Sequence, residues 1–144
     1  MASTVSGLAF AIVLITLFAA VGANFITDFD PNKANPVDRF FEWGQEGHRL
    51  GTDQLGRDTF TRLIYGARLV WVVGLSVSLL AMAFGGVLGS LAGYLGGRVD
   101  GLIGRISDGV LAFPPLLLAL VMSAVIGPST RTAIIALSIV YTPL

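Results

Sequence analysis

The chain has 144 residues, of which 54% are hydrophobic and only 12% are charged. Soluble domains carry about 25% charged residues, so this composition indicates that lipid surrounds much of the chain. The formal net charge is zero, which argues against nucleic-acid binding, where a basic excess is expected. With no cysteine and a single histidine, His48, the chain lacks the side chains for disulfides, thiolate metal sites or multi-histidine clusters.

Three uncharged stretches indicate the broad class of protein to which the chain belongs. They cover residues 2–27, 69–97 and 109–130, and each is long enough for a helix of about 20 residues that crosses a bilayer. A fourth apolar stretch begins at Thr132 and is too short to cross as it stands. The sequence therefore predicts an all-α, multi-pass integral membrane protein, with about three full transmembrane helices and the start of a fourth.

The first stretch is predicted to be an N-terminal transmembrane helix, assigned to residues 1–27. A cleaved signal peptide is the alternative, because "FAAVGANF" offers small residues that resemble a cleavage site. No basic segment precedes the apolar run, and the run is longer than the apolar core of a typical signal peptide. These two features favour the transmembrane helix.

Residues 28–68 form a polar segment that ends in an amphipathic stretch. Prolines and asparagines in "DFDPNKANPVD" indicate a loop, and "RFFEWGQEGHRL" mixes aromatic and charged residues as segments at a membrane interface do. Asp58 is a candidate N-cap for a short amphipathic helix that leads into the second span. A plain interfacial helix without a partner is an equal alternative.

The second span carries a ridge of small residues. Within "GGVLGSLAGYLGG", four glycines lie four residues apart, which lets another helix approach closely in lipid: Gly85, Gly89, Gly93 and Gly97. Packing within the chain is favoured over a dimer interface. A phosphate-binding loop is excluded, because neither the lysine nor the strand that such a loop requires is present.

The connection "RVDGLIGRISDG" is expected to hold at most one turn of interfacial helix before the third span. Pro114 and Pro115 are expected at the start of that span, where proline is tolerated. No charged residue falls in the middle of any span. This weakens the case for an ion-coupled transporter, and an intramembrane enzyme has almost no residue support.

Charge alone predicts an orientation with the first loop inside. Basic residues favour the cytoplasmic side, and six of them lie between the first two spans, against two between the second and third. Those in the first loop are Lys33, Arg39, Arg49, Arg57, Arg62 and Arg68, and those in the second are Arg98 and Arg105.

The stretch "HRLGTDQLGRDTFTRLIYGARLVWVVGL" resembles the permease subunits of dipeptide and oligopeptide ABC importers, a group that includes nickel and glutathione systems. Within that group it is most similar to the C-type subunit. The resemblance continues through "GSLAGYLGGRVD" and "RISDGVLAFPPLLLAL". The family motif falls here on Gly51, Thr52, Asp53, Gly56, Arg57, Asp58, Arg62, Gly66 and Arg68.

The resemblance implies a type I ABC importer transmembrane domain in the cytoplasmic membrane, with residues 69–144 as its N-terminal part. It also implies a second permease subunit, two cytoplasmic ATP-binding subunits and an extracytoplasmic solute-binding protein as partners. The chain itself is then neither an enzyme nor a cofactor protein. The N-terminus is expected to be cytoplasmic and residues 28–68 extracytoplasmic, against the charge count, because long loops escape the charge rule.

Family members usually begin with a basic tail and continue past the equivalent of "YTPL" into a cytoplasmic coupling loop. The sequence is therefore expected to be a fragment, with a degenerate copy as the alternative. The expected function is import of peptides or a related small solute, and a non-transporting membrane scaffold is the second hypothesis. The transported solute is left open, since peptide, nickel-chelate, glutathione and opine carriers share these motifs.

The motif "GTDQLGRD" admits two interpretations. One is a metal site made of His48, Asp53 and Asp58, whose spacing supports it weakly. The other is a tight turn permitted by glycines and followed by a helix cap at Asp58, with Asp53 and Arg57 paired to each other or to a partner. The second interpretation is favoured, because it explains the same residues without a further ligand.

Overall fold

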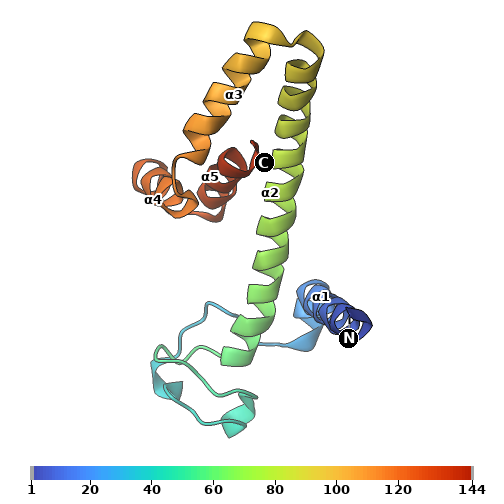
Figure 1. Cartoon of the computed structure of the whole chain (residues 1–144). Coiled ribbons are helices and arrows are strands. Elements are labelled where there is room, and N and C mark those ends of the chain that lie inside the picture. Colours follow the sequence, from blue (N-terminus) through green and yellow to red (C-terminus); the bar gives the residue numbers. More distant parts are fainter. Residues whose placement is uncertain (1, 144) are drawn as a thin grey trace. The chain divides into compact units, whose positions relative to one another are not determined.

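The computed structural model describes residues 2–143, with side chains from Thr4 onward. The described residues form five α-helices and two short 3-10 helices, and no β-strand occurs among them (Figure 1). The predicted all-α class is therefore confirmed. In chain order the elements are α1 (Ala2–Ile26), η1 (Pro36–Asp38), η2 (Gln45–Gly47), α2 (Thr59–Leu95), α3 (Gly97–Leu111), α4 (Pro115–Ile126) and α5 (Thr130–Tyr141).

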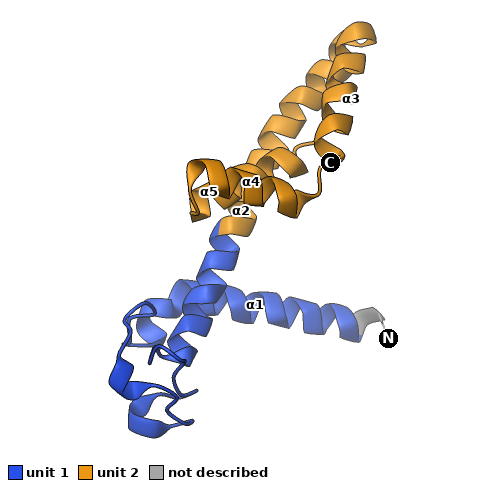
Figure 2. Ribbon diagram, turned by 90° about the vertical axis from the view of Figure 1, so that its left-hand side faces the viewer, with its two compact units in different colours: residues 1–72 blue, residues 73–144 orange. Residues whose placement is uncertain are grey.

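The chain divides into two compact units, residues 1–72 and 73–144 (Figure 2). Unit 1 holds α1, the polar segment and the beginning of α2, whereas unit 2 holds the rest of α2 and the three remaining helices. The boundary of the units therefore lies inside one continuous helix.

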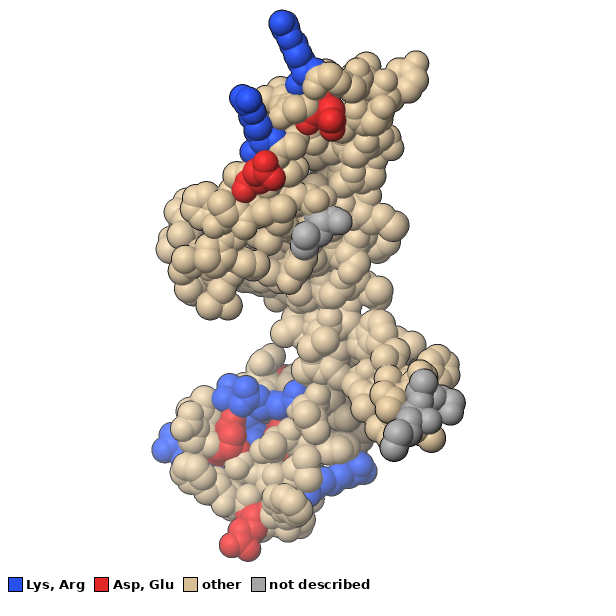
Figure 3. All heavy atoms as spheres, viewed as in Figure 1, with Lys and Arg blue, Asp and Glu red and all other residues tan. Residues whose placement is uncertain are grey.

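Helices α1 and α2 are long and apolar enough to cross a membrane. Most of their large side chains have no protein cover: Phe25 of α1 is 93% exposed and Val70 of α2 is 71% exposed. In Figure 3 the charged side chains visible on unit 1 gather over the polar segment and those visible on unit 2 over α3, while the visible face of α1 is uncharged. Long apolar helices with so little protein cover indicate a membrane protein.

Helix α2 runs without interruption from Thr59 to Leu95. The residues expected to form a short amphipathic helix leading into the second span are the first turns of α2 itself. The helix ends where Gly96 and Gly97 adopt φ values of +59° and +53°, a conformation that glycine reaches without steric cost. Gly97 consequently begins α3 and does not continue the ridge of small residues.

The connection after α2 is more helical than expected. Instead of a single turn, residues 97–111 form the 15-residue helix α3. Pro115 then takes the first position of α4, as expected for a proline that lacks the N–H of a helix interior. Helix α4 has 12 residues and so reaches only about 18 Å. The third span exists only if α3 and α4 count together as a pair bent by 83°.

Unit 2 has a small core built on α5. The Ser129 hydroxyl caps this helix by accepting from the backbone N–H of Thr132 at 3.1 Å. Helix α5 packs mainly on α4 and also touches α3. Its buried side chains are small, which allows this close packing: Thr132, Ala136, Ser138 and Val140.

One glycine of the ridge makes a close tertiary contact. A Cβ at Gly85 would lie 2.6 Å from the backbone oxygen of Thr142, just after α5. At Gly89 and Gly93 a Cβ would meet nothing within 4 Å. Within the described part of the ridge, the close approach of another segment is therefore seen at Gly85 alone, and packing at Gly89 and Gly93 stays a prediction.

These contacts predict opposite effects for two alanine substitutions in one helix. Gly85→Ala places a methyl group against the Thr142 carbonyl and should cost about 1–3 kcal/mol. Gly89→Ala enters open space and should gain up to about 1 kcal/mol from helix propensity. Thermal unfolding of the purified chain in one detergent measures both. An equal effect of the two substitutions would contradict the close approach at Gly85.

Candidate functional site

The polar segment of unit 1 is organised around two aspartates, Asp53 and Asp58. Both belong to the stretch "GTDQLGRD". We refer to residues 27–62, which contain this stretch and the side chains that contact it, as the loop module. Each aspartate gathers donors from several parts of the loop module.

Asp53 closes a tight turn and holds two arginines. Its Oδ1 accepts from the backbone N–H groups of Leu55 at 2.8 Å and Arg57 at 3.0 Å. Its Oδ2 accepts from Nε and Nη2 of Arg57, both at 2.8 Å. Arg62 of α2 also donates to Oδ2 from Nη1. The carboxylate therefore ties the turn to the first turns of α2.

This set of donors favours the ionised form of Asp53. Burial alone raises the pKa of a carboxyl. The backbone and side-chain hydrogen bonds from Arg57 outweigh that effect and hold the pKa of Asp53 well below its usual range. Asp53 is thus held in its anionic form at neutral pH and is matched by the guanidinium groups of Arg57 and Arg62.

The two glycines of the motif meet backbone at very short range. Gly51 has a φ of +67°, and a Cβ there would lie 2.2 Å from the carbonyl oxygen of Phe41. Gly56 has a φ of +72°, and a Cβ there would lie 1.8 Å from the carbonyl oxygen of Asn35. No residue with a side chain fits either position. The turn therefore requires glycine twice, for its conformation and for its neighbours.

Thr52 fastens the preceding part of the loop. It is 8% exposed, and its hydroxyl oxygen accepts from the backbone N–H of Phe41 at 2.9 Å and donates to the carbonyl of Asp38. Its backbone N–H donates to the carbonyl of Phe41 at 3.2 Å. Thr52 also forms an isolated antiparallel bridge with Asp58. One small residue thus joins η1 to the start of α2.

Asp58 is the N-cap of α2. It is 4% exposed, and its Oδ1 accepts from the backbone N–H of Thr61 at 2.6 Å. Because the first N–H groups of a helix have no partner within the helix, such an acceptor stabilises its beginning. The second carboxylate oxygen, Oδ2, lies 2.9 Å from Nδ1 of His48. The cap is therefore also the anchor of the histidine.

His48 is enclosed by aromatic rings and by a second carboxylate. The side chain is 7% exposed, with its ring centroid 4.6 Å from that of Phe29 and 5.9 Å from that of Phe41. Its Nε2 lies 4.0 Å from Oδ2 of Asp38. The imidazole thus lies between carboxylates from η1 and from the start of α2.

The environment of Asp58 also favours the charged form. Burial raises the pKa of this carboxyl, but hydrogen bonds from Thr61 and the neighbouring His48 outweigh burial and lower it. An aspartate with a lowered pKa stabilises the folded state above its ordinary pKa, and this contribution is lost as the pH falls through the lowered value.

The same cluster reaches the end of α1. The hydroxyl oxygens of Thr27 and Thr61 are 2.5 Å apart, and Thr61 is fully buried. One turn later, the Tyr65 hydroxyl donates to Oδ1 of Asn24 at 2.9 Å. A polar path therefore runs from α1 through Thr61 to Asp58.

The structure does not bring the candidate metal ligands together. His48 and Asp58 bond each other, whereas Asp53 is occupied by arginines. No group of three or more histidine, cysteine, aspartate or glutamate residues that could hold a metal ion occurs among the described residues. The contacts seen at these three residues are those of a fold-stabilising network.

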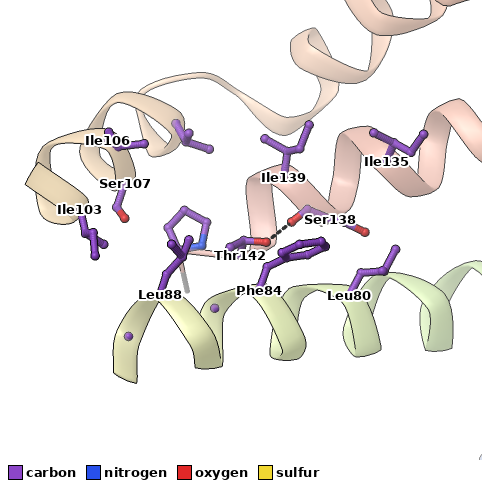
Figure 4. A pocket seen from close by; sticks show the side chains of 14 residues that line it. Leu80, Phe84, Leu88, Ile103, Ile106, Ser107, Ile135, Ser138, Ile139 and Thr142 are labelled. Carbon is purple, nitrogen blue, oxygen red and sulfur yellow. Dashed lines mark hydrogen bonds between the residues drawn. The ribbon is translucent and has the colours of Figure 1, made fainter. Parts of the chain in front are cut away.

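A second candidate is an apolar pocket of about 720 Å³ in unit 2 (Figure 4). Leu80, Phe84 and Leu88 enter from α2, and Ile135 and Ile139 from α5. Among the described residues, Ser138 Oγ in its wall is the buried side-chain atom without a hydrogen-bond partner. The pocket suits an apolar side chain or ligand, and its lining contains no charged group.

Sequence reasoning missed several members of the loop module. Thr61 carries a local signal, because it stands three residues after the cap Asp58, where a backbone N–H needs an acceptor. Thr27 carries none, and neither do Asn24 and Tyr65 just outside the loop module, since their contacts join residues 34 or more positions apart. Gly66 and Arg68 take no part in the loop module: a Cβ at Gly66 would meet nothing within 4 Å, and Arg68 is exposed.

Replacing Asp58 tests two roles together, namely the N-cap of α2 and the hydrogen-bond partner of His48. Asp58→Ala removes the acceptor for Thr61 and leaves His48 without its partner, so it should lower stability by about 1–3 kcal/mol. Asp58→Asn keeps an acceptor oxygen and should cost less. Thermal unfolding in detergent measures this order, with the exposed Asp108→Ala as the matched control. Equal midpoints for Asp58→Ala and Asp108→Ala would contradict the assigned role.

Comparison with known proteins gives clear relatives. A dipeptide transport system permease protein, DppC, of Alkalihalophilus pseudofirmus is 44% identical over 135 residues, which cover 92% of this chain and 44% of the relative. The DppC of Haemophilus influenzae is 38% identical, covering 91% and 46%. A glutathione transport system permease protein, GsiD, of Pectobacterium atrosepticum is 36% identical, covering 91% and 44%.

No protein-family model matches the chain. The chain spans less than half the length of the curated relatives that it matches. The matched part nevertheless includes nearly the whole chain, and each of these relatives is named as a permease protein of a transport system. Over almost all of its length, this chain is homologous to the permease proteins of dipeptide and related peptide transport systems.

Proposed function

We propose that the chain acts in a permease subunit of an ABC importer that moves peptides or a related small solute across the cytoplasmic membrane. The observation that carries this proposal is the identity of 36–44% with transport permease proteins over about nine-tenths of the chain. Dipeptides and glutathione, for whose transport these relatives are named, are both short peptides. Peptides are therefore the first substrate class to test.

The physical properties of the helices support a role within the membrane. Helices α1 and α2 pass the length and hydropathy requirements for a span, and only 6% of each most apolar segment is buried within the chain. Surfaces of this kind need lipid or other helices as cover. We propose that a second permease subunit supplies part of that cover, and that two ATP-binding subunits and an extracytoplasmic solute-binding protein complete the importer.

In this proposal the segments have separate tasks. Residues 1–27 form the first transmembrane helix, residues 28–68 an extracytoplasmic segment, and residues 69–144 the N-terminal part of the transporter's transmembrane domain. The contacts of Asp53 with Arg57 and Arg62, and of Asp58 with Thr61, support a positioning role for the motif residues. The motif would determine where α2 begins and how it leaves the loop module.

Partner recovery and uptake test the proposed function. The gene is tagged at its chromosomal locus, and its product is purified in mild detergent from solubilised membranes. We expect ATP-binding subunits to co-purify, and uptake of labelled dialanine to fall in a strain that lacks the gene and return on complementation. Recovery without any ATP-binding subunit, together with unchanged uptake of dialanine and glutathione, would contradict importer function.

Orientation has its own test, because the natural chain contains no cysteine. Single substitutions Ala34→Cys and Asp100→Cys place one thiol at an exposed position in the polar segment and in α3. A membrane-impermeant maleimide should label Ala34→Cys in intact cells and Asp100→Cys only after permeabilisation. The reverse pattern would place the N-terminus outside, and it would leave the permease assignment unchanged.

A further inference from the structure

We propose that the apolar pocket of unit 2 receives a transmembrane helix of the second permease subunit, and that this helix supplies the hydrogen-bond partner of Ser138. The pocket is formed by α2, α3 and α5 (Figure 4). The identity of the partner rests on the proposed function, whereas the chemistry required of it follows from the walls of the pocket.

The pocket lies at the surface of unit 2 and is not filled by the described residues. Its volume is about 720 Å³, and sites that bind apolar groups commonly enclose roughly 300–1,000 Å³. Large side chains in its walls stay about half exposed: Phe84 is 59%, Leu88 40% and Ile139 42% exposed. The group that covers these side chains therefore comes from outside the described residues.

Ser138 shows that a purely apolar group does not complete the pocket. The residue is 6% exposed, and among the described residues its Oγ is the buried side-chain atom without a hydrogen-bond partner. The neighbouring Thr142 hydroxyl is already engaged, because it donates to the backbone carbonyl of Ser138 at 2.7 Å. A buried hydroxyl without a partner is unfavourable, so the occupant needs a polar atom at the level of Ser138.

The depth of the pocket favours a helix over a lipid. Its residues on α2 fall between 80 and 89, in the middle of the uncharged run 69–97. Lipid at the centre of a bilayer offers only hydrocarbon, which forms no hydrogen bond with a hydroxyl. A transmembrane helix satisfies its own backbone groups, and it can carry one hydroxyl or amide side chain that pairs with a serine on its neighbour.

Gly89 provides room for the backbone of such a helix. It lines the pocket, and a Cβ there would meet nothing within 4 Å. One turn earlier, the backbone of Thr142 already covers Gly85. Small residues let helices approach closely in lipid, where van der Waals contact and hydrogen bonds hold them together.

The composition of the walls narrows the choice of partner. No charged residue lines the pocket, so the helix that enters it presents an uncharged face. Among the partners proposed above, the ATP-binding subunits and the solute-binding protein lie outside the membrane. The second permease subunit is the proposed partner that contributes membrane helices.

Site-specific photocrosslinking tests which molecule fills the pocket. The chain has no cysteine, so Leu88→Cys introduces a single thiol in the lining. Ser90→Cys is the matched control, because Ser90 is exposed, lies outside the lining and points to the other side of α2. The tagged variants are labelled with a benzophenone maleimide in isolated membranes, irradiated and purified. We expect Leu88→Cys to give an adduct with a second permease protein, and Ser90→Cys to give several-fold less.

Other crosslinking products would overturn the inference. These are an adduct with lipid only, an adduct within the tagged polypeptide only, an adduct with a second copy of the chain, and equal yields at the two positions. If ATP-binding subunits still co-purify in such a case, the proposed function stands and only the docking of the helix fails.

Ser138→Ala should act in opposite directions on the chain alone and on the complex. In the purified chain it removes a hydroxyl without a partner, so the midpoint of thermal unfolding in detergent should stay the same or rise. In the tagged complex it removes a hydrogen bond to the partner helix, so recovery of the second permease protein should fall roughly 3- to 30-fold. Ser90→Ala is the control. A lower midpoint for the chain alone, or unchanged recovery of the second permease protein, would refute the role of Ser138.

Discussion

Asp58 is the group on which the order of unit 1 depends, because its two oxygens serve two different parts of the fold. Oδ1 receives the backbone N–H of Thr61 and so begins α2, and Oδ2 bonds His48 and so holds the loop. The buried hydroxyl of Thr61 extends the connection to Thr27 at the end of α1. A buried carboxylate is costly unless hydrogen bonds satisfy it, and here that requirement organises three segments around one side chain.

The two aspartates of the motif have different structural roles. Asp53 gathers Arg57, Arg62 and two backbone N–H groups into a turn with matched charges, and Asp58 performs the capping. Gly51 and Gly56 place the backbone so close to neighbouring carbonyls that no side chain fits. A strongly apolar chain can hold such a polar element because, among the described residues, no buried side-chain nitrogen or oxygen of the loop module is without a hydrogen-bond partner, which removes the main penalty for burying polar groups.

Unit 2 is held together by contacts of a different kind. Its helices are joined by small side chains and by the approach of Gly85 to the Thr142 carbonyl, whereas its large apolar side chains remain outward or line the pocket. Helices in lipid gain little from burying apolar surface against each other, so close contact between small residues supplies the attraction. The exposed faces of these helices are consistent with the membrane subunit proposed for the chain, which is homologous to less than half of each relative.

The sequence by itself determined the class of the protein and the approximate positions of its long helices. Those properties depend on local composition, since an uncharged run of about 20 residues is stable in lipid only as a helix. The cap at Asp58 and the need for glycine in the motif were also readable locally. Tertiary structure alone decided that Asp53 meets Arg62, that His48 bonds Asp58, and that Thr27 meets Thr61. It also decided that the first turns of α2 belong to one long helix and that α3 and α4 bend by 83°. These features depend on how the backbone turns at a few glycines and prolines, and a periodic pattern of hydrophobicity contains no information about the direction of such a turn.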